Sequence, residues 1–370
     1  MNDQPALLFE PITLRGLTVR NRVWVPPMCQ FAVGARNGVP QDWHTVHYGS
    51  LAVGGFGLVV CEFTAVSPEG RITPYDTGLW NDEQQQAWSR IVDIVHASGA
   101  SIGVQLAHAG DKASTERPWP GSRPGLLGVD EGGWAPVGVR NTTLTDRLGR
   151  GVPVHGLDEQ EIAQVIDAFV AATWRAEQAG FDTVEIHAAH GYLLHQFYSP
   201  LINDRTDGWG GSREKRARLT LDVARAVRAT FPSGKPVLLR LSATDWNPRG
   251  WSADDSVWLC RQLREIGIDL VDASTGGLPG ADIAVGPGYQ VGFAERIRRE
   301  AQIPTAAVGL ITDPRQAEEI LEQDRADAVD LGREALRDTN WPLRAAHELG
   351  VPKARAPWAP PRQRGYWQAA

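Results

Sequence analysis

The sequence predicts one (β/α)8 barrel, in which eight parallel strands alternate with helices. Eight short runs rich in β-branched residues are separated by amphipathic segments, an alternation typical of parallel α/β folds, and 370 residues suit one large domain of this class. A doubly wound sheet would usually carry a glycine-rich turn after its first strand, whereas the segment from Met28 to Phe31 has no glycine. We expect strands at 23–28, 57–63, 101–107, 182–187, 237–241, 270–274, 305–308 and 328–331.

The segments between these runs carry helix start and stop signals. Residues 158–161 and 252–255 resemble capping boxes, in which a polar side chain and a carboxylate three positions later bind free amides. Residues 313–314, Asp-Pro, place a cap before a first-turn proline. Gly180 and Gly267 stand where helices would end. The helices are therefore expected to alternate with the strands throughout.

Composition narrows the class of protein. The content is 42% hydrophobic and 22% charged, as in soluble globular proteins, and the net charge of -7 argues against a nucleic-acid partner. No run is long enough to span a membrane, and no signal peptide is visible at the start. Three widely spaced cysteines suit a reducing compartment. We expect a cytoplasmic protein.

The chain has an N-terminal extension before the first strand, and two further segments depart from a minimal barrel. Residues 111–156, after the third strand, contain Trp119 and Trp134 and are long enough to form a capping, lid-like loop. Residues 353–370 form a Pro-rich C-terminal arm ending in Arg364-Gly-Tyr-Trp. Such an arm is either frayed or docked on a partner subunit through its arginines and aromatics. We therefore expect domain boundaries of 1–370, with a homodimer or homotetramer as the assembly.

The stretch VEIHAAHGY, at 184–192, is the strongest candidate site. Chemistry in such barrels gathers at the C-terminal strand ends, and His187, His190 and Tyr192 follow one strand there. The two imidazoles could bind zinc with Glu62 or His108 as a third ligand, polarise a substrate oxygen, or be satisfied core histidines. Tyr192, with an ordinary pKa near 10, keeps its proton at neutral pH and can act as an acid.

Other strand ends point to an anionic ligand. Gly309 and the pair Gly332-Arg333 follow the seventh and eighth strands, where barrels frequently bind phosphate through backbone amides. Gln105 and Arg240 reach the same face, and Lys112 adds a further charge to it. Each of these residues is singly compatible with a tight turn or a surface ion pair.

The chain resembles a known family, the old yellow enzymes, which are FMN-dependent ene-reductases. Within this family it is most similar to the bacterial thermophilic-like branch. The resemblance covers nearly the whole sequence. It is most specific in HAAHGYLLHQF followed by NDRTDGWGGS. It also includes LLFEPITLRGLTVRNRVWVPPMCQF, GVQLAHAGDKAS, LLRLSATDW, TAAVGLITDP and DLGREALRD.

The resemblance implies noncovalent FMN as cofactor. Arg240 would lie near flavin N1 and stabilise the reduced anionic ring, since charge near a cofactor tunes its electronics. The residues implied to bind FMN are Pro27, Met28, Cys29, Gln105, Arg240, Gly309, Gly332 and Arg333.

The resemblance also implies ping-pong reduction of activated alkenes, namely α,β-unsaturated aldehydes and ketones, maleimides and nitroalkenes. NADPH or NADH would reduce FMN and leave, and hydride would then pass from flavin N5 to the β-carbon. His187 and His190 would hold the activating oxygen, and Tyr192 would protonate the α-carbon. Arg364 matches an arginine that reaches a neighbouring subunit's site, and no metal is implied.

Three departures bear on substrate scope. Phe31 replaces a tyrosine that commonly bonds the substrate, Asp111 replaces an arginine at the base of the insertion, and the 111–156 insertion is longer than in the shortest members. Three alternatives stay open: a dienoyl-CoA reductase, which would carry a Cys-rich cluster segment and an added domain, a metal-dependent hydrolase using His187 and His190, and an inactive barrel acting as a binding scaffold.

Overall fold

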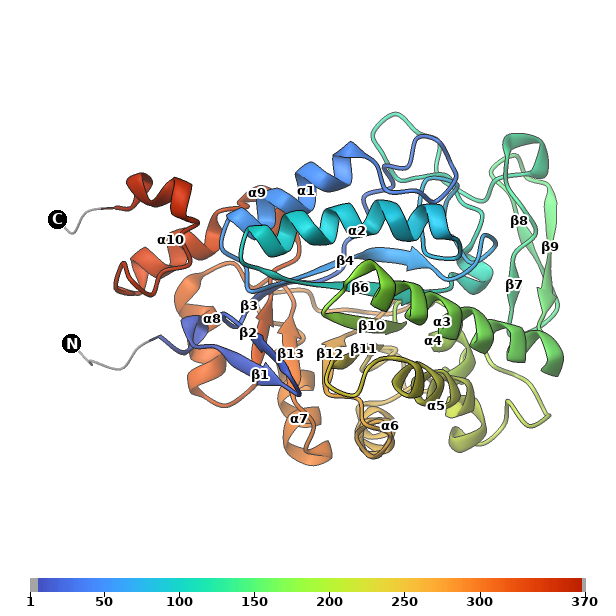
Figure 1. Cartoon of the computed structure of the whole chain (residues 1–370). Helices are drawn as coiled ribbons and strands as arrows, with labels where there is room; N and C mark the ends of the chain where they lie inside the picture. Colours follow the sequence, from blue (N-terminus) through green and yellow to red (C-terminus); the bar gives the residue numbers. More distant parts are fainter. Residues whose placement is uncertain (1–5, 368–370) are drawn as a thin grey trace.

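The computed structural model describes residues 6–367, and these form a closed barrel of parallel strands wrapped by helices (Figure 1). The strands run around the barrel in the order β3, β14, β13, β12, β11, β10, β6, β4, and the pairing of β3 with β4 closes the ring. The predicted fold class is confirmed. The barrel strands are β3 (Val23–Val25), β4 (Leu58–Ala65), β6 (Ser101–Ala107), β10 (Thr183–Ala188), β11 (Val237–Ser242), β12 (Leu270–Ser274), β13 (Thr305–Val308) and β14 (Ala328–Asp330).

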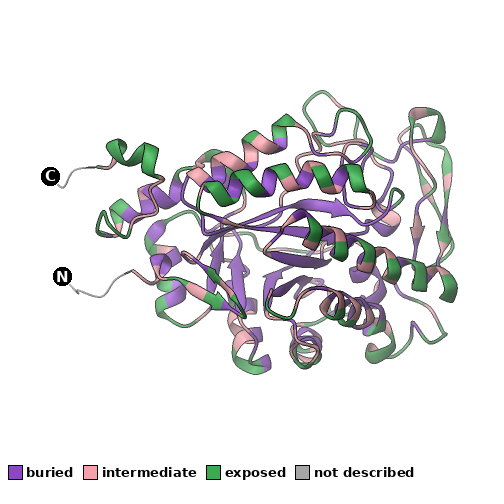
Figure 2. Ribbon diagram, in the orientation of Figure 1, coloured by how far each residue is buried: buried purple, intermediate pink, exposed green. Residues whose placement is uncertain are grey.

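Helices connect the strands and cover the outside of the barrel, so that the strands are buried on both faces (Figure 2). Two further short helices, α4 (Leu193–Tyr198) and α9 (Arg333–Arg337), follow β10 and β14. The outer helices are α1 (Asp42–Val53), α2 (Asp82–Ala97), α3 (Glu159–Ala179), α5 (Arg213–Thr230), α6 (Ala253–Ile266), α7 (Val291–Ala301), α8 (Pro314–Glu322) and α10 (Trp341–Glu348). No helix within 6–367 is both long and apolar enough to cross a bilayer.

The predicted helix signals are confirmed where the structure tests them. Asp158 accepts a hydrogen bond from the Glu161 amide, and Ser252 accepts one from the Asp255 amide, each within a capping box. Asp313 caps α8 ahead of Pro314. Gly180 and Gly267 end α3 and α6 with φ of 94° and 98°, in the left-handed region that glycine adopts readily.

Two predicted strand ends were wrong, one by three residues and one by two. The first strand stops at Val25 rather than at residue 28, because Pro26 and Pro27 have no amide hydrogen to donate to a neighbouring strand. The second continues to Ala65 rather than 63, since its pairing with β6 resumes after an irregularity between Cys61 and Phe63.

The lower half of the barrel interior, at the N-terminal ends of the strands, is apolar. A hairpin of β1 (Ile12–Leu14) and β2 (Leu17–Val19) contributes to it. We call this group the lower layer; its buried members are Leu14, Val19, Trp24, Leu58, Val60, Leu238, Leu270, Ala306 and Ala328.

The insertion and the C-terminal arm lie at opposite ends of the molecule (Figure 1). Residues 111–156 include β7 (Val137–Gly138), β8 (Thr142–Thr145) and β9 (Gly151–Gly156), which form a small separate sheet. The arm contains the short helix η4 (Pro360–Gly365), which is exposed (Figure 2). The remaining elements are β5 (Thr77–Gly78) beside β4, and the 3-10 turns η1 (Leu7–Phe9), η2 (Gly110–Lys112) and η3 (Val129–Glu131).

Candidate active site at the C-terminal ends of the strands

Above the lower layer, the interior of the barrel becomes polar. Gln105 of β6 is in register with Glu185 of β10, and Arg240 of β11 is in register with Asp272 of β12. Asp330 of β14 belongs to the same charged group, because it acts electrostatically on Arg240, and all five side chains are buried. We call Gln105, Glu185, Arg240, Asp272 and Asp330 the upper layer.

One cation and three carboxyl groups share this layer. Arg240 Nε lies 2.8 Å from Asp272 Oδ2. Burial alone would lower the pKa of Arg240, but Asp272 and the other carboxyls raise it, so the guanidinium stays charged. Burial, with Asp272 nearby, raises the pKa of Glu185 to about 8, and burial raises that of Asp330 well above its ordinary value. Burial raises the pKa of Asp272 as well, and Arg240 opposes that rise. The layer therefore holds one ion pair, between Arg240 and Asp272, and two further carboxyl groups whose protonated forms are favoured by burial.

Gln105 is oriented by Glu185. Its Nε2 donates to Glu185 Oε1 at 2.8 Å. No hydrogen bond within residues 6–367 uses its Oε1, and this orientation leaves that carbonyl as an acceptor. Arg240 Nη1 donates to the Pro27 carbonyl at 3.3 Å. The layer thus offers an amide acceptor and a guanidinium to a ligand, and both are buried.

His187 and His190 reach the open end of the barrel as neutral imidazoles. Burial, followed by the charge of Arg240, lowers the pKa of both rings well below the ordinary value. His187 Nδ1 accepts from the Ala189 amide at 3.3 Å, so its proton is on Nε2 and available to a ligand. The two rings are 5.2 Å apart.

Ser274 determines the tautomer of His190. Its Oγ lies 2.7 Å from His190 Nε2. The other acceptor within reach, Gln290 Oε1, is 3.5 Å away and already accepts from Thr275 at 2.6 Å. The Ser274 hydroxyl therefore donates to His190, which places the imidazole proton on Nδ1. Both histidines then act as donors without carrying charge.

Lys112 fixes the backbone of His190. Its Nζ donates to the carbonyls of His190 and Gly277, at 2.7 and 3.2 Å, and Ser242 Oγ accepts from the His190 amide at 2.9 Å. His190 has a φ of 60°, which is unusual for a non-glycine residue. Gly277 allows the approach, because a Cβ there would lie 2.1 Å from the His190 carbonyl carbon. Strain of this kind is typical of functional sites.

Tyr192 lies beside the histidines as a protonated phenol. Its ring is 5.0 Å from that of His187 and 5.1 Å from that of Phe63, and Lys112 Nζ lies 4.8 Å from its centroid. Burial raises the pKa of Tyr192 well above its ordinary value. The phenol therefore keeps its proton at neutral pH and lies beside the ring of His187.

The loop after β3 completes this side of the site. The Gln30 amide donates to Glu62 at 2.7 Å, and Glu62 also accepts from Tyr48 at 3.0 Å. Burial raises the pKa of Cys29, which stays a neutral thiol. Glu62 thus supports the loop. The alternative of a zinc site has no support here: within residues 6–367 no three His, Cys, Asp or Glu side chains are grouped to hold a metal ion.

The phosphate candidates lie at the ends of β13 and β14. Gly332 precedes α9, and a Cβ on it would approach nothing closer than 3.7 Å, to the Met28 sulfur. Gly309 has a φ of 127°. The first turn of a helix leaves amides without intrahelical partners, and Arg333 is the first residue of α9. With Gln105 and Arg240, these residues fit a flat ring bearing polar edges and a phosphate, as in FMN.

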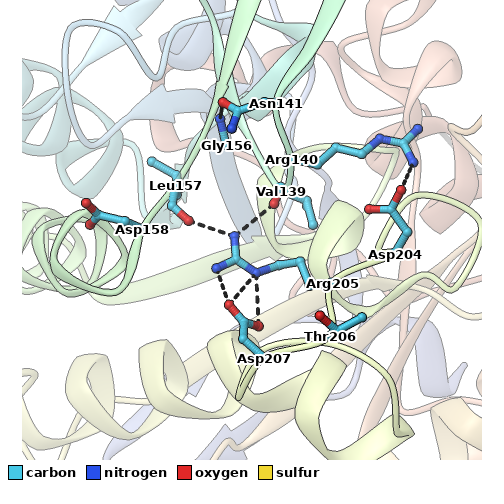
Figure 3. A pocket seen from close by; sticks show the side chains of 10 residues that line it. All are labelled: Val139, Arg140, Asn141, Gly156, Leu157, Asp158, Asp204, Arg205, Thr206 and Asp207. Atoms are coloured by element: carbon cyan, nitrogen blue, oxygen red, sulfur yellow. Dashed lines mark hydrogen bonds and ion pairs between the residues drawn. The ribbon is translucent and has the colours of Figure 1, made fainter.

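Most of the specific motif NDRTDGWGGS supports the fold rather than the chemistry. Arg205 Nη1 donates to the carbonyls of Val139 and Leu157, at 2.9 and 2.6 Å, and its Nε and Nη2 bind Asp207 (Figure 3). Arg140 pairs with Asp204 at 2.6 Å. Both residues line a shallow surface pocket, together with Arg205 and Asp207 (Figure 3). Arg205 therefore fastens the C-terminal ends of the neighbouring strands β7 and β9 to the loop that precedes α5.

Three residues that the sequence linked to substrate binding lie in three different environments. Phe31, with a φ of 53°, packs against the apolar cluster that Tyr192 also contacts. Asp111 is half-buried, and burial raises its pKa while Lys112 and Arg140 oppose that rise. Arg364 is exposed on η4 of the C-terminal arm. This arm lies at the end of the molecule opposite the β7–β9 sheet (Figure 1).

Several residues of the site were missed from the sequence. Ser274 and Asp272 lie on predicted strands and Ser242 directly follows another, but no role in the site was predicted for any of the three. His195, which accepts from the Gly191 amide at 2.8 Å and contacts Asp245 at 2.7 Å, holds the loop after β10 in place. The signal for Asp272 was present: an acid within the apolar run LVDAS is out of place in a strand buried on both faces.

The chain is similar to known oxidoreductases over nearly its whole length. A family model described as "NADH:flavin oxidoreductase / NADH oxidase family" matches residues 7–351. An NADPH dehydrogenase of Geobacillus thermodenitrificans is 44% identical over 95% of this chain and 96% of its own length. That of Bacillus subtilis is 40% identical over 93% and 95%. The solved structure of morphinone reductase in complex with tetrahydroNAD has a TM-score of 0.74 and 28% identity, covering 92% of this chain and 91% of its own.

Proposed function

Because the chain belongs to the NADH:flavin oxidoreductase / NADH oxidase family, as a member of the old yellow enzymes, we propose that it is an ene-reductase acting on activated alkenes. It is an oxidoreductase that uses FMN with NAD(P)H as reductant. The proposal adds the substrate class, which is alkenes conjugated to a carbonyl or nitro group. The single observation that carries it is the pair of neutral imidazole donors beside a protonated tyrosine.

FMN, when bound, supplies the hydride chemistry, accepting hydride from the nicotinamide and delivering it to the alkene. The side chains of this chain that would hold it come from five strands. Gln105 and Arg240 would bind the polar edge of the ring, Gly309, Gly332 and Arg333 would bind the phosphate, and Pro27, Met28 and Cys29 would line the ring. Arg240 would place positive charge beside it, with Asp272 as the counterion.

His187 and His190 would donate hydrogen bonds from Nε2 and Nδ1 to the oxygen that activates the alkene. Donors held in place before reaction stabilise charge that develops on that oxygen. Tyr192 would then give its proton to the α-carbon, and its position against His187 supports this role. An alkene without an oxygen for the histidines to hold is expected to be a very poor substrate.

The proposal extends to Phe31, to Arg364 and to the two added segments. Phe31 would contact the substrate through its ring alone, which removes one hydrogen bond and favours less polar alkenes. Arg364 would act in the site of a neighbouring subunit, within a homodimer or homotetramer, because it is exposed on an arm at the end of the molecule opposite the β7–β9 sheet. We propose a cytoplasmic location, and residues 111–156 and 353–370 as a lid and an interface arm on one barrel domain.

A matched pair of substrates tests this function. We expect the purified protein to be yellow, to release FMN on denaturation, and to oxidise NADPH anaerobically with 2-cyclohexenone or a maleimide. Cyclohexene, which has the same ring and double bond but no oxygen, should give no turnover. A colourless protein that FMN cannot reconstitute, or equal rates with both ring compounds, would contradict the proposal.

A further inference from the structure

Four side chains form a stack at the rim of the site. The Arg117 guanidinium lies 4.1 Å from the centroid of Tyr75 on one side and 3.9 Å from that of Trp119 on the other. Arg36 lies over the Tyr75 ring at 4.8 Å and also contacts its hydroxyl. Cations alternate with aromatic rings, an arrangement that holds each guanidinium flat and in a fixed place. We call Arg36, Tyr75, Arg117 and Trp119 the arginine–aromatic stack.

The stack is attached to the loop that lines the site. Trp119 Nε1 donates to the Gln30 carbonyl at 3.2 Å, and Arg117 Nη1 donates to that of Phe31 at 3.4 Å. The Val33 amide donates to the Tyr75 carbonyl at 3.0 Å. Phe31, in turn, packs in the same apolar cluster as Tyr192. The stack therefore lies one loop away from the proton donor, on the solvent side.

Neither arginine of the stack has an acidic partner among residues 6–367, where most arginines pair with a carboxylate. The nearby acids are engaged elsewhere. Glu116 accepts from the backbone amide of Arg117 at 3.0 Å and contacts the Arg147 guanidinium at 3.5 Å, but it forms no ion pair with the Arg117 guanidinium. Asp76 is buried, accepts from the Ile72 amide at 2.6 Å, and has a pKa raised by burial to about 7. Glu69 acts electrostatically on Arg71. The guanidiniums of Arg36 and Arg117 are therefore available to bind an anion, even though the chain as a whole has a net charge of -7.

Arg71 extends the positive charge of the rim. Its Nη1 donates to the Arg36 carbonyl at 2.9 Å, and its guanidinium lies over the rings of Trp80 and Trp134, at 5.5 and 4.9 Å. It also holds the backbone of Arg36, which has a φ of 56°. Arg71 thus holds Arg36 in a rare backbone conformation, and such strain is typical of functional sites rather than of ordinary exposed loops.

We propose that the arginine–aromatic stack binds the phosphate groups of the reduced nicotinamide nucleotide while its nicotinamide ring occupies the site. This inference rests on the proposed function, because it takes the ring to lie between the histidines and the loop after β3. The phosphates of a dinucleotide extend beyond the ring and must leave the barrel across its rim. Arginine is the side chain suited to phosphate, since its planar fork donates two parallel hydrogen bonds.

The proposal is tested by separating phosphate binding from ring binding in the holoenzyme. We compare Arg36→Gln and Arg117→Gln with Arg90→Gln, which removes the same charge from an exposed position on α2. Calorimetry measures the Kd of 2′-phospho-ADP-ribose, a probe that carries the phosphates and no nicotinamide. We expect the Kd to rise about tenfold or more in each stack variant, as for loss of a charge-assisted hydrogen bond, and to stay unchanged in Arg90→Gln.

Kinetics with two hydride donors provides the second measurement. KM for NADPH should rise in the stack variants, while KM for 1-benzyl-1,4-dihydronicotinamide, which has no phosphate, should stay as in the unmodified enzyme. Equal loss with both donors would show that the stack only supports the loop, and unchanged probe binding would overturn the proposal. If Arg117→Gln loses FMN, the exposed Arg36→Gln decides the question alone. Failure of the phosphate-free donor to reduce the unmodified enzyme would instead count against the proposed function itself.

Discussion

The two halves of the barrel interior have opposite composition. The lower layer is filled by Trp24, Leu238, Leu270 and their apolar neighbours, whereas the upper layer buries Arg240 and three carboxyl groups. Burying apolar area stabilises the fold, while burying ions costs free energy that their mutual attraction seldom returns in full. We infer that the lower layer offsets the cost of the upper one, and that the upper one exists for its chemistry.

The largest effect should come from the lower layer. Trp24→Ala removes a buried indole whose Nε1 donates to the Asn21 carbonyl at 3.0 Å. We expect a loss of about 3–5 kcal/mol in the free energy of unfolding, measured by urea denaturation. The rate constant for alkene reduction per folded molecule should stay within about twofold of that of the unmodified enzyme. A selective loss of rate without loss of stability would erase the distinction between the layers.

A change above the upper layer should instead lower the rate of alkene reduction. His187→Ala removes a donor aimed at the substrate oxygen, and losing one such donor typically lowers the rate about 10²–10³-fold. Reduction of the enzyme by NADPH should be far less affected, because no negative charge develops on the carboxamide oxygen of the nicotinamide as the ring gives up hydride. Stopped-flow absorbance at the flavin band measures both steps. Similar losses in the two steps would mean that His187 supports the site rather than the substrate.

Glu185→Gln addresses the cost of the upper layer directly. Folded Glu185 keeps its proton up to about pH 8, but the unfolded chain releases it near its ordinary pKa of 4.5. Stability of the unmodified protein therefore falls as pH rises between these values, by about 1.4 kcal/mol per unit from this group at most. Glutamine cannot titrate, so the variant should lose less stability between pH 5 and pH 8. Parallel melting curves for both proteins across that range would exclude a protonated Glu185.

The smallest effect should follow Ser274→Ala. Without the hydroxyl, His190 Nε2 loses the donor that places its proton on Nδ1, and the imidazole is free to present either tautomer. We expect the Kd of a carbonyl inhibitor such as p-hydroxybenzaldehyde to rise about fivefold, which corresponds to about 1 kcal/mol. Ser274→Thr, which keeps the hydroxyl, is the control, and an equal rise in both variants would argue against control of the tautomer.

The sequence predicted the barrel because buried strands are apolar runs bounded by helix caps, and both signals are local. It also predicted that His187, His190, Tyr192, Gln105 and Arg240 gather at one end, because all parallel strands end there. Boundaries were less well predicted at β3, where two prolines end a run that is still apolar.

The supporting contacts were not predictable, because they join distant parts of the chain. Lys112 and the His190 carbonyl are 78 positions apart, and nothing in either segment marks the other. The arginine–aromatic stack likewise joins residues near 36, 75 and 117. Asp272 and Asp330 are different: each is an acid inside an apolar strand, and that local signal was overlooked.

The central claim is that Tyr192 is a proton donor and does nothing for the reductive step. Tyr192→Phe keeps the ring that packs on Phe63 and His187 and removes only the hydroxyl. Rapid mixing should show reduction of the enzyme by NADPH unchanged within about twofold, and reoxidation by 2-cyclohexenone slowed about 10²-fold or more, as for loss of a general acid. Reoxidation at the unmodified rate, or equal slowing of both steps, would contradict the account.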